Sequence, residues 1–561
     1  NKEFLVRYQP GAEDVEIRQA RIYRRLPTGD VQILQASDRD DRDLSEPWYG
    51  LYYDQRAAVV RFEGLRAGDV LDVQYAISDT SNQNEMADYF GDLQFLGEAI
   101  PKLRWDYTLI GPKSRTFYTN TPRAATLTTR TTDEGGERIL RFAAHDLPKI
   151  DVEPAMPGYA EVTPYLHVST YASWADVGTW YWQLVADQLA ADEALRQAAR
   201  GAVAGATTDL ERVRAIHTLV LTGTRYVGLE FGIHGYKPYK VTQVLSRRFG
   251  DCKDKASLMV ALLREVGIDA ELVLLRTRRA GRIETMPASL AVFDHAIVYV
   301  PRLSLYLDGT AEFSGMDELP NQDQGVMGLR VSARGATLVD TPVLPSSRNL
   351  AQRRWTIDLD PAGTARVDET LTIAGQAAAD WREHYQTPGE RLDRYGKVWT
   401  ARHPGSALLS VEMPGLEDRA HPVVVRAAAT VPRLGVAYGD RELALPITAR
   451  EGDFTRAYAR LSTRKQDLLI AYPWQHEEEL IFHLPASMRV QHLPAARLVT
   501  SDFGRFRLDV ATDATGRVHV RSALDVTGYR LTPADYPRFR AFLGAIDAVL
   551  ADHVVVRTDP S

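Results

Sequence analysis

The chain has 561 residues, of which 45% are hydrophobic and 25% are charged. These values are ordinary for globular proteins, and they exclude a disordered or fibrous chain. At usual domain sizes the length predicts about three to four domains. The formal net charge of −7 argues against nucleic acid as a partner, because proteins that bind it present a basic surface. No apolar run approaches the roughly 18 residues of a membrane helix, so no transmembrane segment is predicted.

The beginning of the chain is predicted to form a β domain. Apolar and polar residues alternate over 15–23, 57–62 and 70–77, as they do in half-buried strands. Turn-forming sequences such as Pro27-Thr-Gly-Asp30 separate these runs. Short strands at this spacing predict an antiparallel β-sandwich over residues 1–165.

Helical periodicity appears in the middle of the chain. Apolar residues recur with the period of an α-helix over 174–189 and again in the segment after Cys252. Apolar, strand-like runs follow between residues 268 and 307. Helices followed by an antiparallel sheet predict an α+β core domain over residues 166–340.

A linker rich in proline and serine, residues 342–347, separates this core from a third domain. Strand patterns return beyond it, for example at 365–373 and 517–526, and the chain closes with an amphipathic helix that starts near Pro533. The sequence therefore predicts a β-rich C-terminal domain over 346–561 that ends in a helix. The predicted fold class of the whole chain is multidomain α+β.

The single cysteine, Cys252, lies at the start of a predicted helix. Backbone N–H groups and the positive end of the helix dipole stabilise a thiolate there, and Lys253 and Lys255 are expected to add positive potential. The alternative is a small buried apolar residue, the commonest role of a free cysteine. One cysteine excludes an intrachain disulfide and a Cys-rich zinc site, and no metal or cofactor is predicted.

A predicted hairpin brings a histidine and a carboxylate together. Two apolar runs flank Pro301-Arg302, and a hairpin centred there pairs Val300 with Leu303 and places His295 directly opposite Asp308. Opposed side chains on one face of a sheet have Cβ atoms about 4.5–5.5 Å apart. A carboxylate at that distance orients an imidazole and stabilises its protonated form. Alternatively, His295 is a core histidine and Asp308 is a turn-forming residue.

Cysteine at a helix start, then histidine and aspartate on successive strands, is the order of a cysteine triad. The chain resembles the transglutaminase-like superfamily, a branch of papain-type folds, in three motifs: Gly250-Asp-Cys-Lys-Asp-Lys-Ala256, Phe293-Asp-His295 and Tyr306-Leu-Asp-Gly-Thr310. Residues 226–238 are similar to one bacterial branch, in which an N-terminal β domain of unknown function precedes the core and a β-rich domain follows it. The resemblance is strongest over residues 224–330.

The resemblance implies a role for each matching residue. Cys252 matches the nucleophile, His295 the general base and Asp308 the residue that orients the histidine. The backbone N–H of Cys252 is expected to be one oxyanion donor. Tyr226 is the candidate for a second donor, with a core aromatic of a strand as the alternative. Residues expected to line the substrate groove are Glu230, His234 and Tyr236.

Such a site implies thiol-dependent acyl transfer on a peptide or carboxamide bond through a thioester. Hydrolysis by a peptidase or amidase and transamidation of protein glutamine share this intermediate. We favour hydrolysis, because water is always present whereas amine transfer requires a dedicated site. The alternative is a catalytically silent binding or scaffold protein of the cell envelope. The presence of Cys252, His295 and Asp308 together favours the enzyme.

The expected partner is a peptide or protein substrate, and the two β domains are candidates for binding a protein of the cell envelope. Relatives in the resembled branch usually carry export signals, and this chain begins with Asn1 instead of methionine. We therefore expect a periplasmic or secreted protein, with the cytoplasm as the alternative, although no signal peptide is visible in the sequence.

Overall fold

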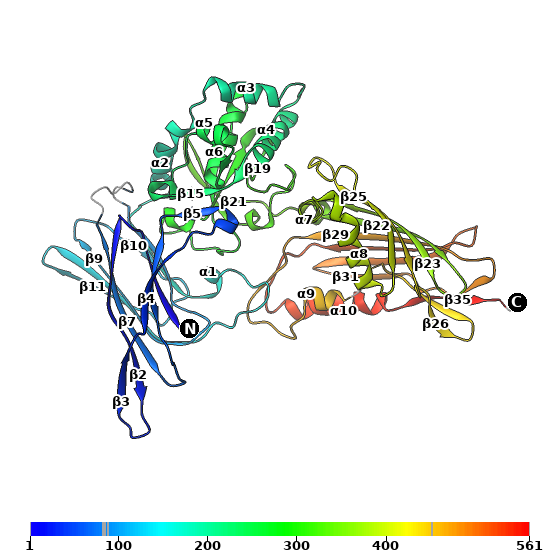
Figure 1. Ribbon diagram of the computed structural model, residues 1–561, viewed down its shortest axis with the longest axis horizontal. Coiled ribbons are helices and arrows are strands. Elements are labelled where there is room, and N and C mark those ends of the chain that lie inside the picture. Colours follow the sequence, from blue (N-terminus) through cyan, green and yellow to red (C-terminus); the bar gives the residue numbers. More distant parts are fainter. Residues whose placement is uncertain (1, 81–85, 87–88, 450–452, 560–561) are drawn as a thin grey trace.

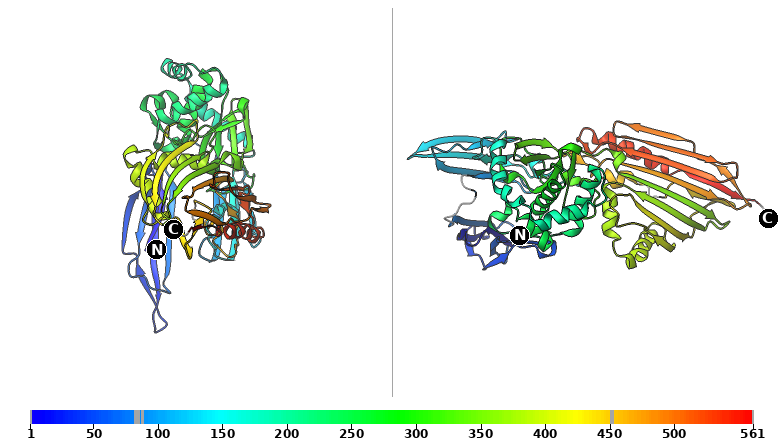
Figure 2. Two further views of the ribbon diagram at one scale, coloured as in Figure 1. Left: turned by 90° about the vertical axis from the view of Figure 1, so that its right-hand side faces the viewer. Right: turned by 90° about the horizontal axis from the view of Figure 1, so that it is seen from above.

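The computed structural model describes residues 2–80, 86, 89–449 and 453–559. Figure 1 shows three parts: N-terminal sheets at the left, a core with helices at the top and a broad C-terminal sheet at the right. Seen from above in Figure 2, the core lies between the other two parts. This arrangement confirms the predicted multidomain α+β architecture. Among the described residues, no helix is both long enough and apolar enough to cross a membrane.

The N-terminal part is built from antiparallel sheets of three strands each. Along the second half of one strand, buried residues such as Ala20 and Ile22 alternate with more exposed neighbours, which is the pattern of a sheet with one buried face. In sheet order, two of the sheets are β1 (Glu3–Tyr8), β6 (Arg56–Arg61) and β4 (Asp38–Asp43), and β3 (Val31–Gln35), β2 (Glu13–Arg25) and β7 (Val70–Asp79). The other two are β11 (Thr128–Glu134), β12 (Glu137–Leu147) and β9 (Lys102–Pro112), and β10 (Tyr118–Asn120), β13 (Tyr165–Ser169) and β8 (Gly91–Phe95).

One N-terminal strand leaves these sheets and joins the core. β5 (Leu51–Tyr53) pairs in parallel with β15 (Gly228–Glu230). Gly50, which precedes β5, has φ +68°, and its carbonyl oxygen accepts a hydrogen bond of 2.8 Å from the N–H of Gly228. A Cβ atom on Gly50 would lie 2.9 Å from the carbonyl oxygen of Tyr226. The N-terminal part and the core therefore pack backbone against backbone at this point.

The core is a five-stranded antiparallel sheet with helices packed on it. In sheet order its strands are β19 (Leu305–Leu307), β18 (His295–Val300), β17 (Glu271–Leu275), β20 (Met327–Ser332) and β21 (Gly335–Asp340). Its helices are α2 (Trp174–Val185), α3 (Glu193–Ala202), α4 (Asp209–Gly223), α5 (Val241–Arg247) and α6 (Cys252–Glu265). The side chains of α6 from Lys253 to Leu263 are buried, because this helix packs against β18 on one side and against α3, α4 and α5 on the others. The core thus holds α6, which begins at Cys252, against β18, the strand that begins at His295.

The hairpin that carries the candidate histidine has a different register from the predicted one. Val300 pairs with Leu305, two residues beyond the predicted partner, because a 3-10 turn, η5 (Pro301–Leu303), occupies the tip. The prediction that His295 lies directly opposite Asp308 is therefore wrong. A shift of two residues preserves the face of the sheet on which each side chain lies, so the two residues meet as a diagonal pair instead.

The C-terminal part is dominated by an eight-stranded sheet. In sheet order its strands are β24 (Ala407–Glu412), β25 (Val423–Val431), β23 (Ala365–Ile373), β22 (Leu350–Leu359), β29 (Trp474–His483), β33 (Val518–Val526), β32 (Gly504–Thr512) and β31 (Arg497–Ser501). A smaller sheet consists of β26 (Val436–Gly439), β27 (Glu442–Pro446), β35 (His553–Thr558) and β30 (Met488–His492). The predicted terminal helix is α10 (Tyr536–Leu550), whose buried face includes Phe539 and Ile546, and β35 follows it.

Helix α7 (Gln376–His384) of the C-terminal part holds a loop of the core. The buried guanidinium of Arg382 donates hydrogen bonds to both carboxylate oxygens of Glu318, at 2.7 and 3.4 Å, and to two backbone carbonyl oxygens. The side chain of Gln376 donates to the carbonyl oxygen of Leu319 at 2.6 Å. The loop between β19 and β20 is therefore fixed from the C-terminal side, although it belongs to the core.

Candidate active site

Cys252 is the first residue of α6, as predicted. The carboxylate of Asp251 accepts a hydrogen bond of 3.2 Å from the N–H of Asp254, whose own carboxylate accepts one of 3.4 Å from the N–H of Asp251. This reciprocal capping box fixes where the helix starts. Because the first N–H groups of a helix have no partner inside it, the N–H of Cys252 is available to a bound oxyanion. Cys252 itself is half-buried.

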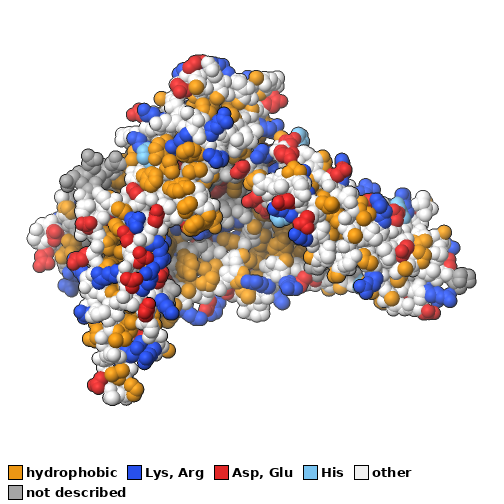
Figure 3. Space-filling model, viewed as in Figure 1, with side chains coloured by type: hydrophobic (Ala, Val, Ile, Leu, Met, Phe, Trp, Pro, Cys, Tyr) orange, Lys and Arg blue, Asp and Glu red, His pale blue; other side chains and the backbone are white. Residues whose placement is uncertain are grey.

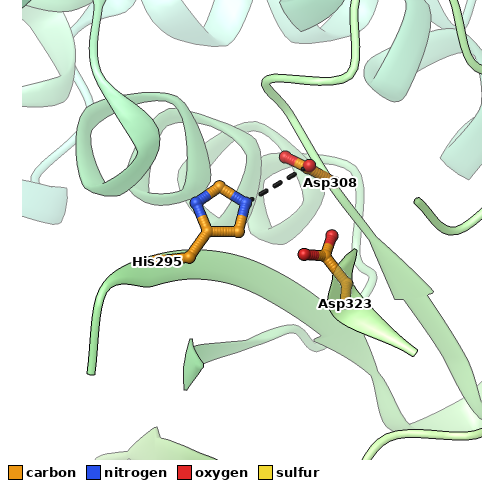
Figure 4. A group of neighbouring side chains, drawn as sticks. All are labelled: His295, Asp308 and Asp323. Carbon is orange, nitrogen blue, oxygen red and sulfur yellow. Dashed lines mark hydrogen bonds and ion pairs between the residues drawn. The ribbon is translucent and has the colours of Figure 1, made fainter. Parts of the chain in front are cut away.

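His295 and Asp308 lie next to each other, as Figure 4 shows. The Nε2 atom of His295 is 3.3 Å from Oδ2 of Asp308. The other carboxylate oxygen of Asp308 accepts hydrogen bonds from the N–H and the hydroxyl of Thr310, at 2.7 and 2.8 Å. The aspartate is thus held through both of its carboxylate oxygens.

The two groups stabilise each other's charge. Burial alone would lower the pKa of His295, but the charge of Asp308 and hydrogen bonds with Asp308 and Cys252 outweigh it and raise this pKa well above the ordinary value of 6.5. Burial would likewise raise the pKa of Asp308, whereas His295 and the hydrogen bonds from Thr310 lower it below its ordinary value. An imidazolium beside a carboxylate is therefore the favoured state of the pair at neutral pH.

Cys252 and His295 face a common cavity of about 490 Å³. The thiol of Cys252 is one of the neighbouring groups that raise the pKa of His295. The wall of the cavity comes from two parts of the chain, which was not predicted. It includes Tyr181, Tyr236 and Phe293 of the core and Gln9, Tyr53 and Asp54 of the N-terminal part.

A second carboxylate adjoins the His295–Asp308 pair, and it was not predicted from the sequence. Asp323 ends the short helix η6 (Asn321–Asp323), and Figure 4 shows its side chain directed toward the pair. One ligand atom of each of the three residues lies within 4.8 Å of the others. Asp323 is only 2% exposed, and its Oδ2 atom has no hydrogen-bond donor among the residues that the structure describes. Burial first, and then the charge of Asp308, raise the pKa of Asp323 well above its ordinary value and favour the protonated carboxyl group.

Three side chains of this kind can also ligate a metal ion. A metal ion at this place would take the Nε2 atom through which His295 binds Asp308. Metal binding and the His295–Asp308 hydrogen bond therefore exclude each other. A proton on Asp323 satisfies both carboxyl groups without displacing the imidazole.

The positive potential predicted from two lysines near Cys252 is largely compensated. Lys253 forms an ion pair with the helix-capping Asp251, and Lys255 donates a hydrogen bond of 2.8 Å to the carbonyl oxygen of Thr224. Burial lowers the pKa of Lys255 to about 8. The groups left to stabilise a thiolate are the imidazolium of His295 and the start of α6.

The four residues predicted upstream of the cysteine have different surroundings. Glu230 and Tyr236 line the cavity. Tyr226 is 38% exposed, which disfavours the alternative of a core aromatic. The ring of His234 instead stacks on Tyr239 with centroids 3.9 Å apart, and His234 is not among the residues of the cavity wall.

The sequence matches known families in three places. Residues 196–301 match the transglutaminase-like superfamily. Residues 1–151 and 443–556 match DUF3857 and DUF3858, both described as domains of unknown function with a solved structure. The chain therefore contains a transglutaminase-like core, as the resemblance implied, flanked by a DUF3857 domain and a DUF3858 domain. The expected N-terminal domain of unknown function and C-terminal domain are thus confirmed. No curated protein matches the chain.

The overall fold is similar to that of a solved structure. This is a "putative protease" from Parabacteroides distasonis ATCC 8503, with a TM-score of 0.68 and 14% sequence identity over 99% of this chain and 92% of that chain. A "putative cysteine protease" from Cytophaga hutchinsonii is 15% identical over 45% of this chain and 88% of that chain, with a TM-score of 0.19. At 14% identity the first similarity shows a shared fold alone.

Proposed function

We propose that this protein is a thiol-dependent acyl-transfer enzyme that acts on peptide or carboxamide bonds. The observation that carries the proposal is the 3.3 Å contact between His295 and Asp308, at the edge of a cavity that also holds the Cys252 thiol. The shared fold with a protein described as a protease is consistent with this chemistry.

The reaction follows from the placement of these groups. His295 takes the proton of the thiol, and the thiolate sulfur of Cys252 attacks the carbonyl carbon of the substrate. The C–N bond then breaks, the leaving amine takes the proton from the imidazolium, and a thioester with Cys252 remains. Water, deprotonated by His295, hydrolyses this thioester to a carboxylic acid and restores the thiol. An amine in place of water would give a new amide, and we favour hydrolysis because water needs no binding site of its own.

The two aspartates have different roles in this proposal. Asp308 binds Nε2 of His295, which leaves Nδ1 as the nitrogen that exchanges a proton with the thiol. The protonated Asp323 is a positioning residue: it donates a hydrogen bond to Asp308 and keeps that carboxylate aligned with the imidazole. The N–H of Cys252 stabilises the negative oxygen that forms when the sulfur attacks.

Alkylation of Cys252 by iodoacetamide tests the proposal. Because Cys252 is the only cysteine, the intact mass reports its modification without interference. We expect rapid labelling between about pH 5 and about pH 7, where a free thiol with a pKa of about 8.5 reacts slowly. In His295→Ala the rate in this range should fall by about 10- to 100-fold, because the protonated imidazole no longer holds the thiolate.

The same measurement separates the enzyme from the silent binding protein that was the alternative. Labelling that follows the titration of an ordinary thiol, and that ignores the substitution of His295, would contradict the proposal. The cavity would then be a site that binds a ligand without turnover. The open cavity beside Cys252 favours the enzyme, since a binding protein has no need of a reactive thiol at that place.

Replacing Asp323 tests its role as a proton donor. Asp323→Asn keeps an N–H donor for Asp308, whereas Asp323→Ala removes it. Because a hydrogen bond to a charged group contributes about 1.5–3 kcal/mol, alkylation of Cys252 near neutral pH should slow by about 10- to 100-fold in the alanine variant. The asparagine variant should stay within about threefold of the native rate.

The pH dependence gives a second readout. As the pH rises through the elevated pKa of Asp323, the native protein loses its donor and the rate should fall, whereas the amide of Asp323→Asn does not titrate. An alkaline decline in the native protein that is missing in Asp323→Asn is therefore expected. If the pH profiles of the native protein and of Asp323→Asn coincided, Asp323 would not act as a proton donor. The same conclusion would follow if Cys252 were alkylated as slowly in the asparagine variant as in the alanine variant.

A further inference from the structure

The cavity at Cys252 is completed by the N-terminal part of the chain. Gln9 and Asp54 line it together with the nucleophile. The Asp54 carboxylate accepts hydrogen bonds from the side chain of Gln9, at 2.5 Å, and from the backbone N–H of Gly232, at 2.9 Å. Asp54, a residue of the N-terminal part, is thus hydrogen-bonded to the segment of the core that precedes Cys252. The parallel pairing of β5 with β15 keeps this wall in place.

The wall of the cavity is acidic. Its carboxylates are Asp54, Glu230 and Asp294. Its cations are Lys253, which is paired with Asp251, and the imidazolium of His295, which is paired with Asp308. Asp294 accepts two hydrogen bonds of 2.7 Å from the N–H and the hydroxyl of one threonine. In the described part of the chain, the hydrogen bonds to Asp54 and Asp294 come from uncharged donors. The charge of Asp294 also interacts with the buried Arg276, whereas Asp54 has no charged hydrogen-bond donor among the described residues.

Glu230 is the least satisfied of the three carboxylates. It is half-buried, and it accepts no hydrogen bond from any residue that the structure describes. Burial raises its pKa, while the charge of Lys253 lowers it. A carboxylate in this position is stabilised when a cation enters the cavity and supplies the missing donor.

Exposed aromatic side chains lie on the chain segments that carry Asp54 and Glu230. Trp48 is 74% and Tyr49 66% exposed in the short helix η1 (Pro47–Tyr49), and Tyr52 and Phe231 add partly exposed rings on β5 and just after β15. Figure 3 shows hydrophobic side chains gathered on the face of the molecule where β5 and β15 lie. Aromatic faces attract cations and pack well against the aliphatic stems of long basic side chains. We refer to these four residues as the aromatic rim.

We infer that the cavity selects a polypeptide segment with a lysine or arginine side chain next to the amide that Cys252 attacks. The inference rests on the proposed function and names its substrate class. The cationic head of the basic residue pairs with Glu230 and Asp54, and the flanking chain lies on the aromatic rim. An acidic segment would meet uncompensated carboxylates at the same place and is excluded.

Two reactive peptides test this preference. Both carry an N-terminal iodoacetyl group, followed by lysine in one and by Nε-acetyl-lysine in the other. The rate at which each alkylates Cys252 is divided by the iodoacetamide rate of the same protein variant, which separates recognition from thiol reactivity. In the native protein we expect the lysyl peptide to react at least about 10-fold faster, the effect of one hydrogen-bonded charge pair.

The ratio of the two rates should fall toward one in Glu230→Gln and in Asp54→Asn, which keep the shape of each side chain but remove its charge. Glu63→Gln is the matched control, because Glu63 is an exposed carboxylate of the N-terminal part and is not part of the cavity wall. Added salt should also reduce the ratio, since the recognition is electrostatic.

The inference and the proposed function fail in different ways. Equal rates for the two peptides in the native protein would overturn the inference, and so would a preference that survives in the double variant Glu230→Gln with Asp54→Asn. Slow labelling by iodoacetamide itself would instead contradict the proposed function, whatever the ratio between the peptides.

Discussion

Acylation of Cys252 by p-nitrophenyl acetate is expected to slow by about 10²- to 10⁴-fold in His295→Ala, the usual contribution of a positioned general base. The reason is that His295 binds Asp308 and shares the cavity with the Cys252 thiol, so its imidazole is the group placed to take the proton of the thiol. Release of nitrophenolate gives the rate, and the intact mass shows whether the acetyl group resides on the protein.

Two controls make this result specific. Cys252→Ala should form no thioester with the acetyl group, because the chain has no other cysteine. His145→Ala changes a histidine whose side chain is 72% exposed and should behave as the native protein does. If His295→Ala were acylated as fast as the native protein, the imidazole would not be the base, and the proposed mechanism would have to be abandoned.

Removing the side chain of Arg382 should lower the free energy of opening of the loop between β19 and β20 by about 3–5 kcal/mol. This is the usual effect of breaking a buried ion pair. The substitution leaves the carboxylate of Glu318 in a buried site where its remaining donor is the N–H of Gly315, at 2.7 Å. Hydrogen exchange of the backbone amides in residues 309–326 of Arg382→Ala measures the free energy of opening directly. Because Asp323 lies in this loop, alkylation of Cys252 should slow as well.

A double variant shows whether the pair is responsible. Glu318→Gln in the background of Arg382→Ala removes the stranded charge and should recover part of the lost stability. As a matched control, Arg394→Ala removes an arginine whose ion pair with Glu390 is exposed, and such pairs contribute about 0–1 kcal/mol. Unchanged exchange in Arg382→Ala would mean that other contacts hold the loop.

The central helix and its cysteine could be predicted because their signals are local. The apolar spacing after Cys252 defines a buried helix, and the cysteine is its first residue. The register of the hairpin, in contrast, could not be predicted from local signals. The register of a strand pair depends on the conformation of the turn, and Pro301 starts a 3-10 turn that the strand pattern does not encode. The pairing of His295 with Asp308 survives because an error of two residues keeps both on one face.

Asp54 and Asp323 could not be predicted by the same means. Asp54 lies in a bend after β5 and Asp323 ends the short helix η6, and each reaches the site through contacts that no local pattern encodes. The family motifs identify residues of the core alone. Asp54 belongs to the N-terminal part and reaches the site because β5, which it follows, pairs with β15. The sequence around Asp323 contains a proline, a glutamine and a glycine near an acid, which is also the composition of an ordinary turn.

The contact between Arg382 and Glu318 also has a consequence for the order of events during synthesis. A ribosome delivers Cys252, His295 and both aspartates before the helix that fixes their loop, and domains of a nascent chain fold in the order of their synthesis. A growing chain would therefore expose its thiol while the carboxyl groups behind the imidazole are still free to move. Competence for chemistry would come last, when the C-terminal sheet closes on the core and Arg382 binds Glu318.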